Sequence, residues 1–448
     1  MNGVAKRRMM APAANRERFP TQVLPAILVL YACLLPRELT FEIGGIAFQP
    51  FRTVLTLLLP VLLFQAVSQR LRASFVDFLI IFATIWIAIA LTVNETIDVA
   101  LVTGSSESLN LGLAYFAGRV SIRTSRDFQA FVYAVLPGLF LCAVLMAAES
   151  ITHTHYLRPA VGRLMGTGGG SPTVDLRNGL MRARGPFAHN ILAGVFLASF
   201  LPIVWYMVQK PAWRVIGLLG VGGFFFSLGS TGVLGFVIGS GLIFTNFLHR
   251  STKAPVFPVV TGAAIFAMIA IEIFSGSGVF PFLIRNLTFS PASGYYRIAI
   301  WSNAGADVMN HPLFGIGMRE YQRPAWMVVS SVDAHWLLIT LKHGFPLGLS
   351  VLVATISSAT MSLRGAWSPH ALDQRAGFAV GFSLVAIIVM GLAVYLWEGM
   401  GIWLTLLTGM GVSLGQQMKQ AAKVRAPRRA PPAPRRSAPA RRFHPRPA

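Results

Sequence analysis

The segment from Gly276 to Pro346 reads GSGVFPFLIRNLTFSPASGYYRIAIWSNAGADVMNHPLFGIGMREYQRPAWMVVSSVDAHWLLITLKHGFP. It is the longest interval between apolar runs, and it gathers arginines, histidines and aromatic residues in a chain that is otherwise poor in charge. The sequence on both sides consists mainly of runs with the length and polarity of membrane helices. We therefore expect this segment to form one wall of an active site on the outer face of a membrane.

The overall composition is that of a membrane protein. Of 448 residues, 54% are hydrophobic and 12% are charged, and the mean hydropathy is +0.61. Soluble domains carry about 25% charged residues. The fold class that we predict is an all-α polytopic membrane protein. The first apolar run has no small-residue cleavage site after it, so we interpret it as a retained helix and not as a signal peptide.

Apolar runs long enough to cross a bilayer number about twelve. They cover residues 21–36, 51–68, 75–93, 98–118, 127–148, 188–208, 213–229, 231–249, 256–275, 335–361, 376–396 and 399–416. The run 98–118 is the weakest, because the polar stretch from Thr103 to Ser108 interrupts it. Glu107 inside this run is either a residue of a polar pathway or a sign that the span lies partly outside the membrane.

The basic residues assign the sides of the membrane. With twelve spans, the groups at the N-terminus, 70–72, 119–126, 210–214, 250–253, 364–375 and the C-terminal tail all fall on one side, and cationic loops face the cytoplasm. Both termini are then cytoplasmic, and the large loops 149–187 and 276–334 are periplasmic. The predicted organisation is a basic N-terminus (1–20), a membrane domain (21–416) and a tail (417–448).

The tail is rich in proline, alanine and arginine, and the chain has no acidic residue after Glu398. We predict disorder from Ala421 onward, because such a segment has too little apolar surface to offset the entropy of ordering. Next to membrane helices, a basic tail indicates cytoplasmic retention and contact with anionic membrane lipids, and not nucleic-acid binding.

The first periplasmic loop contains Asn178-Gly179, which predicts a two-residue hairpin turn. The hairpin would bring Arg177 and Arg182 near one another and place Arg184 at the start of the helix expected from Ala188; a solvated surface ribbon is the alternative. His153 and His155 do not form a metal-ligand set with any tight cluster, and Cys33 and Cys142 lie within apolar runs. We predict neither a metal site nor a cofactor.

The second periplasmic loop has helical spacing from Gly294 to Asn310, with Arg297 near one face, and we expect an amphipathic helix at the membrane surface. His311-Pro312 ends this helix, and Gly315 and Gly317 permit a tight turn after it. Residues 331–333 then offer an N-cap, so that His335 enters the next membrane helix in its first turn, where an anion is favoured.

Three motifs in this part of the chain resemble one family. They are His311-Pro312-Leu313-Phe314-Gly315-Ile316-Gly317, the set Asp333-Ala334-His335 with Gly344-Phe345-Pro346-Leu347-Gly348, and Arg184-Gly185-Pro186-Phe187-Ala188-His189-Asn190. Together they resemble the bacterial O-antigen ligase and O-antigen (exopolysaccharide) polymerase superfamily over residues 180 to 350. The chain differs from the family at His189, where proline is usual, and at Trp336, where a polar residue is common.

The resemblance implies a metal-independent glycosyltransferase of the bacterial inner membrane with a periplasmic active site. Its donor would be a glycan on undecaprenyl pyrophosphate, transferred en bloc and with inversion to a sugar hydroxyl of a glycan or of lipid A core. Polysaccharide assembly proteins would be its partners. Carried over by motif, Arg184 and Arg297 would bind the pyrophosphate and His335 would be the catalytic residue.

The chemistry of these side chains agrees with those roles. The planar guanidinium group grips phosphate through two hydrogen bonds, and it stays charged at every relevant pH. A histidine titrates near neutrality and can accept the proton of the acceptor hydroxyl or bond to phosphate. Arg182, Arg285 and Arg319 are reserve arginines, and Asp333 is a candidate to orient His335. For the phosphate arginines, headgroup anchoring is the alternative.

Several functions stay open on the sequence alone. A polymerase is favoured over a ligase only because exopolysaccharide systems use this architecture widely. A transporter or flippase usually shows inverted repeats and discontinuous helices with polar sites at the midplane of the membrane, and here the polar residues concentrate in the outer loops. A non-catalytic scaffold for envelope assembly would tolerate alanine at Arg184, Arg297 and His335.

Overall fold

A computed structural model describes residues 19–69, 71–167, 174–275, 278, 281–282 and 291–425. The segments 1–18 and 426–448, which belong to the predicted basic ends, lie outside these residues, as does Arg285. The predictions made for them stay predictions. The helix that ends the described chain continues to Arg425, so the first residues of the segment from Ala421, where we predicted disorder, are helical instead.

The described chain is helical apart from two short hairpins. The α-helices are α1 (Leu24–Cys33), α2 (Pro50–Ser68), α3 (Phe75–Asn94), α4 (Ile97–Ser121), α5 (Ser125–Thr152), α6 (Leu157–Leu164), α7 (Asn190–Ser199), α8 (Leu201–Met207), α9 (Pro211–Gly222), α10 (Ser230–Thr252), α11 (Val256–Phe274), α13 (Pro291–Asn310), α14 (His335–Leu363), α15 (Ala371–Met390) and α16 (Gly399–Arg425). The 3-10 helices are η1 (Thr21–Val23), η2 (Arg37–Leu39), η3 (Gly223–Ser227) and η4 (Arg364–Trp367). The strands are β1 (Phe41–Ile43), β2 (Ile46–Phe48), β3 (Leu176–Arg177) and β4 (Leu180–Met181).

These helices confirm an all-α membrane protein. Within the described residues, eight helical segments are long and apolar enough to cross a membrane: α2, α3, α5, α7 with α8, α10, α11, α14 and α15. The other four predicted spans are also helical, as η1 with α1, α4, α9 with η3, and α16, but they are shorter or less apolar. Twelve membrane crossings therefore stay a prediction.

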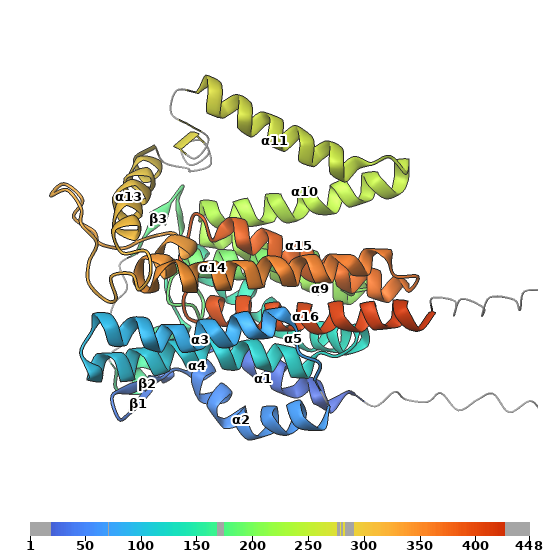
Figure 1. The fold of residues 1–448 in the computed structure, drawn as a ribbon, viewed down its shortest axis with the longest axis horizontal. Helices are drawn as coiled ribbons and strands as arrows, with labels where there is room; N and C mark the ends of the chain where they lie inside the picture. Colours follow the sequence, from blue (N-terminus) through green and yellow to red (C-terminus); the bar gives the residue numbers. More distant parts are fainter. Residues whose placement is uncertain are drawn as a thin grey trace, which may run out of the picture.

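The bundle has two distinct ends (Figure 1). The amphipathic helix α13, the strand β3 of the first loop and the β1–β2 hairpin lie at one end of the long helices. Both ends of the described chain lie at the opposite end. This arrangement agrees with a topology in which the termini share one side and the two large loops share the other.

Helix continuity differs from the sequence prediction at two places. The polar stretch from Thr103 to Ser108 does not break α4, which is a regular helix throughout. The hydroxyl of Ser108 donates to the carbonyl of Thr84 on α3 at 2.9 Å, so the polar face is satisfied by a neighbouring helix. The break occurs instead in α14, at Gly344, whose φ of 81° is outside the helical region.

The motif from His311 to Gly317 fills the break in α14. The N–H groups of Ile316 and Gly317 donate to the carbonyls of Leu341 (2.8 Å) and Lys342 (3.0 Å), which have lost their helical partners. The N–H of Phe345 donates to Pro312. A side chain at Gly344 would overlap the backbone of Leu313, and only glycine permits this approach. The motif thus has a structural role, because broken helices at membrane depth need their backbone groups paired within the protein.

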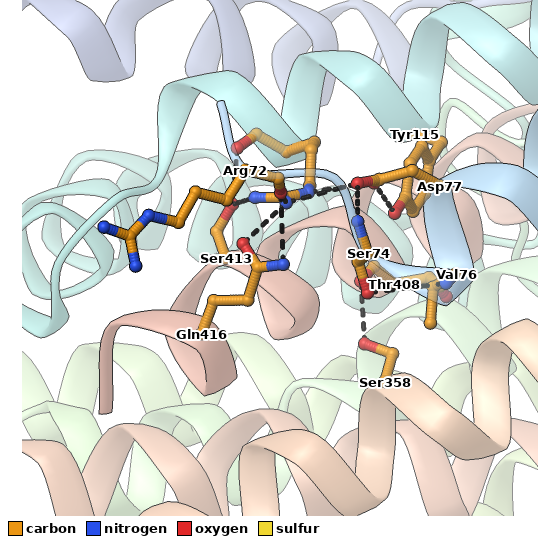
Figure 2. A network of polar contacts seen from close by, with 10 residues as sticks. Arg72, Ser74, Val76, Asp77, Tyr115, Ser358, Thr408, Ser413 and Gln416 are labelled. Atoms are coloured by element: carbon orange, nitrogen blue, oxygen red, sulfur yellow. Dashed lines mark hydrogen bonds and ion pairs between the residues drawn. The ribbon is translucent and has the colours of Figure 1, made fainter. Parts of the chain in front are cut away.

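A buried ion pair joins three helices near the end where the chain termini lie. Arg119 of α4 is 2% exposed and donates to both carboxylate oxygens of Asp77 on α3, at 3.0 and 3.3 Å. It also donates to Ser413 and Gln416 of α16. Figure 2 labels these two acceptors together with Asp77. The helices α4 and α16 approach closely because Gly118 faces the backbone of Leu406.

Two local predictions for the large loops, a hairpin and a helix, are confirmed in the part of the chain that the structure describes. Asn178 and Gly179 both have positive φ, 52° and 77°, and they close the β3–β4 hairpin. The helix predicted from Gly294 is α13, and its apolar face packs on the start of α14 through a small separate core that includes Ile300, Ala304, Val308, Leu337 and Leu341. This packing fixes the position of Arg297 relative to α14.

Candidate functional site

His335 is the first residue of α14, as predicted, but the local capping differs. The N-cap is Ala334, which forms no side-chain cap, so the N-cap predicted at residues 331–333 was wrong. The N–H of His335 donates to the carbonyls of Gly391 (2.8 Å) and Val394 (3.1 Å). This N–H is therefore occupied and is not available to an anion, and any anion must be bound by side chains instead.

A series of aromatic rings connects His335 to the end of the first large loop. The His335 and Tyr395 rings stack with centroids 5.7 Å apart, and those of Tyr395 and Trp397 stack at 5.6 Å. Trp397 then contacts His189 at 6.0 Å. The rings come from the start of α14, from the segment between α15 and α16, and from the N-cap of α7. Three segments that are far apart in sequence therefore meet around one aromatic wall.

Tyr395 and Trp397 were not predicted as site residues. Tyr395 was predicted to lie inside a span covering 376–396, whereas α15 ends at Met390 and residues 391–398 form an irregular connection. The sequence signal that could have identified them is the cluster Tyr395-Leu396-Trp397-Glu398 at the end of the predicted span on its predicted periplasmic side, because aromatic residues are common at membrane interfaces. Glu398 has a φ of 49°, and backbone strain of this kind often occurs at functional sites.

A cavity of about 150 Å³ opens beside His335. It lies between α3, α4, α14 and α16, and its polar lining consists of His335, Glu107, Asn110, Lys342, His343, Tyr395, Trp397, Glu398 and Thr405. The Nδ1 atom of His335 is buried and has no hydrogen-bond partner among the described residues. His335 is thus an unpaired polar side chain at the edge of a space that is large enough for part of a ligand.

Arg184 lies in a loop that a buried carboxylate holds in place. Glu149, which has no exposed surface, accepts the backbone N–H groups of Arg184 (3.1 Å) and Gly185 (2.9 Å) through Oε2. Gly185 has a φ of 52°, a conformation that disfavours other residues. Arg158 donates to the carbonyl of Ala188 at 3.0 Å and so fixes the end of the same loop. The backbone around Arg184 is therefore positioned by charged groups of its own loop.

The Arg184 guanidinium group is left without a carboxylate partner. Its Nε is buried with no hydrogen bond in the described part of the chain. Burial lowers the pKa of Arg184 and the positive charge of Arg158 lowers it further, whereas the carboxylates of Glu149 and Glu38 oppose this shift. The guanidinium group itself is half-buried and pairs with no carboxylate of the described residues, so it can still bind an anion. This electrostatic arrangement suits an anionic ligand.

Arg297 has a similar environment on α13. Its side chain is half-buried and forms no hydrogen bond or salt bridge with another described residue. Burial lowers its pKa, and the nearby Asp333 carboxylate opposes this shift. Asp333 forms no hydrogen bond with His335 in the described structure, so the role suggested for it, orienting the histidine, has no support there. Its charge acts on Arg297 instead.

Charges from both large loops act on His189. The residue is partly exposed, and the partial burial of its imidazole lowers the pKa, as do the charges of Arg182 and Arg184 from the first loop. The carboxylate of Asp333, from the second loop, acts on the same ring in the opposite direction. Because Asp333 also acts on Arg297, charges from both loops surround His189. No direct contact joins Arg184, Arg297 and His335 in the described structure.

Two reserve arginines have other partners. Arg182 pairs with Asp175 at 2.8 Å within the first loop. Arg319 donates to the carbonyl of Ile316 and to the side chain of Asn94, both at 3.1 Å, and so ties the loop after α13 to the end of α3. The charge of Arg182 still acts on the His189 imidazole, so Arg182 belongs to the surroundings of the site. The contacts of Arg319 instead stabilise the fold.

The comparisons with known proteins assign no identity to this arrangement. No protein-family model matches the chain. A search of curated proteins also finds no relative. The function must therefore be argued from the residues and their geometry.

Proposed function

We propose that this protein is a membrane glycosyltransferase that moves a glycan from undecaprenyl pyrophosphate, en bloc, to a sugar hydroxyl. We propose further that it acts as an O-antigen or exopolysaccharide polymerase in the bacterial inner membrane, with both termini cytoplasmic and the site periplasmic. The observation that carries the proposal is the ring series from His335 to His189, because it joins the cavity of the candidate base to the loop of the unpaired Arg184.

Each residue has a defined task in this proposal. Arg184 and Arg297 bind the pyrophosphate and stabilise the negative charge that grows as it leaves. The acceptor hydroxyl attacks the anomeric carbon from the opposite face; the new carbon–oxygen bond forms as the bond to phosphate breaks, and the configuration inverts. The hydroxyl proton passes to the imidazole of His335. The arginines supply positive charge to the leaving group, and no metal ion or other cofactor is part of the proposal.

A ligase that attaches glycan to lipid A core would use the same residues with another acceptor. A polysaccharide gel from a deletion strain distinguishes the two. A polymerase predicts loss of long chains with single repeats still attached to core. A ligase predicts loss of all attached repeats and accumulation of lipid-linked polymer. Unchanged polysaccharide would contradict the whole proposal.

A second candidate function, a transporter of lipid-linked precursors, is favoured by one observation. The helix α14 is discontinuous at Gly344, and beside the break His343 pairs with Glu107 at 2.9 Å inside the bundle. Broken helices and polar groups at membrane depth are common in transporters. Purified protein in lipid vesicles separates the two functions. A transferase converts donor and acceptor into product, whereas a transporter only moves the donor across the bilayer.

A further inference from the structure

A paired glutamate and histidine lie on the floor of the cavity beside His335. Glu107 Oε2 and His343 Nε2 are 2.9 Å apart. Glu107 is ten residues from the start of α4, or about 15 Å along the helix at 1.5 Å per residue. Charged groups inside a membrane bundle are costly and usually have a function. The proposed roles of Arg184, Arg297 and His335 leave this pair unexplained.

The polar groups of the floor are only partly satisfied by the protein. Glu107 keeps 30% of its side-chain surface exposed although it lies deep in the bundle, because it faces the cavity. Its contact with His343 is its only hydrogen bond or ion pair with the described residues. The Nδ1 atom of His343 is buried and has no partner among the described residues, as is true of that of His335. Buried polar atoms normally have partners, so these atoms indicate a polar ligand.

The wall above the floor is aromatic. Tyr395 and Trp397 stack on each other and both line the cavity, and the Glu107 carboxylate lies close enough to raise the pKa of Tyr395 further, beyond the effect of burial. Sites of this kind, in which aromatic surfaces are combined with a few placed polar groups, bind and orient small organic ligands. A sugar ring has apolar C–H faces and a rim of hydroxyls, and it fits both features.

The size of the cavity limits how much of a glycan can enter. Pockets that enclose whole drug-sized ligands measure about 300–1,000 Å³, and this one is about 150 Å³. It therefore accommodates one ring and not a complete repeat. Since His335 lies at its edge, the ring that enters is close to the group that would take its proton.

We infer that this cavity is the acceptor subsite, which takes the terminal sugar ring of the acceptor glycan. Glu107 accepts hydrogen bonds from the ring hydroxyls, and the pair with His343 holds the carboxylate in position. Tyr395 and Trp397 line the wall beside the ring. The attacking hydroxyl gives its proton to His335 as its oxygen bonds to the donor carbon and pyrophosphate leaves. This inference rests on the proposed transferase function and adds the residues that select the acceptor.

The test uses the full-length protein in nanodiscs. The probe is the repeat unit of the host's own polysaccharide, released from its lipid carrier by mild acid. Binding is measured by calorimetry, and transfer is measured with the lipid-linked donor. For Glu107→Gln, which preserves the side-chain size, we expect at least tenfold weaker binding of the repeat and a tenfold higher acceptor KM. The donor KM should change less than threefold, because the pyrophosphate is bound elsewhere.

A matched control and a second variant keep the inference testable. Asn246→Ala removes another buried polar side chain, which bonds to Tyr206 at 2.7 Å away from the cavity, and it should leave both constants unchanged. If Glu107→Gln fails to fold, Trp397→Leu should give the same selective rise in acceptor KM.

The outcomes separate the subsite from the transferase. If the variant that folds transfers glycan with an unchanged acceptor KM, the acceptor subsite is wrong and the transferase function stands. Repeat binding by a wild-type protein that transfers nothing would overturn the transferase and leave a sugar-binding site. If neither binding nor transfer occurs, both are wrong.

Discussion

The carboxylate of Glu149 is fully buried, and its Oε2 atom accepts the backbone N–H of Arg184 across 3.1 Å. The same oxygen accepts the N–H of Gly185 and lies 3.1 Å from the Nδ1 of His155. A single acid near the end of α5 therefore sets the backbone from which the candidate phosphate-binding arginine projects. In the first large loop, a carboxylate with no exposed surface positions a residue that is central to the proposed chemistry.

Glu149→Ala should impair transfer without preventing membrane insertion. Each buried N–H left without its acceptor costs about 1–3 kcal/mol, so the loop is expected to shift. Misplacement of a binding group by about 1 Å can cost roughly 100-fold in rate, and we expect a loss of this order in a lipid-linked glycan assay. Glu42→Gln, at an exposed position of β1, is the control and should keep wild-type activity. Full activity of Glu149→Ala would show that the loop position is unimportant.

His335→Ala should abolish glycan transfer while expression and membrane insertion stay normal. General-base groups contribute about 10²–10⁴-fold to rate, so the rate of the variant should be lower than that of the wild type by about that factor in the same assay. His249→Ala, which changes an exposed histidine at the end of α10, should behave as wild type. An active His335→Ala variant would remove the assigned catalytic role.

Arg184→Lys and Arg297→Lys should each raise the donor KM about tenfold. Lysine keeps the charge but loses the planar fork that binds phosphate through two hydrogen bonds. The acceptor KM should be unaffected, which separates these variants from Glu107→Gln. Arg163→Lys, an exposed arginine on α6, provides the matched control. If the alanine variants of Arg184 and Arg297 both retain activity, a non-catalytic scaffold becomes the better explanation.

Protein stability should fall as the pH drops below about 6.5, which is the ordinary pKa of a histidine side chain. Burial and the charges of Arg182 and Arg184 lower the pKa of His189 in the folded state. Below pH 6.5 the unfolded chain gains a proton that the folded chain does not, so stability is lost until the pH reaches the folded pKa. His189→Asn should reduce this pH dependence in thermal melts between pH 7 and 5. Identical pH profiles of stability for the variant and the wild type would contradict the lowered pKa of His189 in the folded state.

The sequence could predict those features that depend on neighbouring residues. Asn178-Gly179 specifies its turn because both positions need positive φ. The start of α14 at His335 follows from the change to an apolar run. In both cases the signal lies within a few residues of the structure that it predicts, and the structure agrees.

Features that depend on distant partners were not predictable in the same way. The stretch from Thr103 to Ser108 is polar, yet it stays helical because α3 accepts its hydrogen bond at Thr84. The break at Gly344 exists because the motif after α13, including Ile316, supplies the missing backbone partners. Tyr395 was assigned to a membrane span because hydropathy does not show where α15 ends. The candidate site therefore needed the structure, since its walls come from four separate parts of the chain.

Arg119→Leu should destabilise the bundle by about 3–5 kcal/mol, the cost of leaving one partner of a buried ion pair unpaired. The change leaves the Asp77 carboxylate (labelled in Figure 2) without its charged partner, because its oxygens accept two hydrogen bonds from Arg119. Unfolding by titration with denaturing detergent measures the loss of stability.

Arg37→Ala is the contrasting variant. The arginine side chain of its pair with Glu398 is 54% exposed, and such pairs contribute about 0–1 kcal/mol. Because Arg119 is not part of the cavity, the folded fraction of Arg119→Leu should keep its acceptor and donor KM. A loss below about 1 kcal/mol would mean that glycine-mediated packing of α4 on α16, and not the ion pair, holds this end of the bundle together.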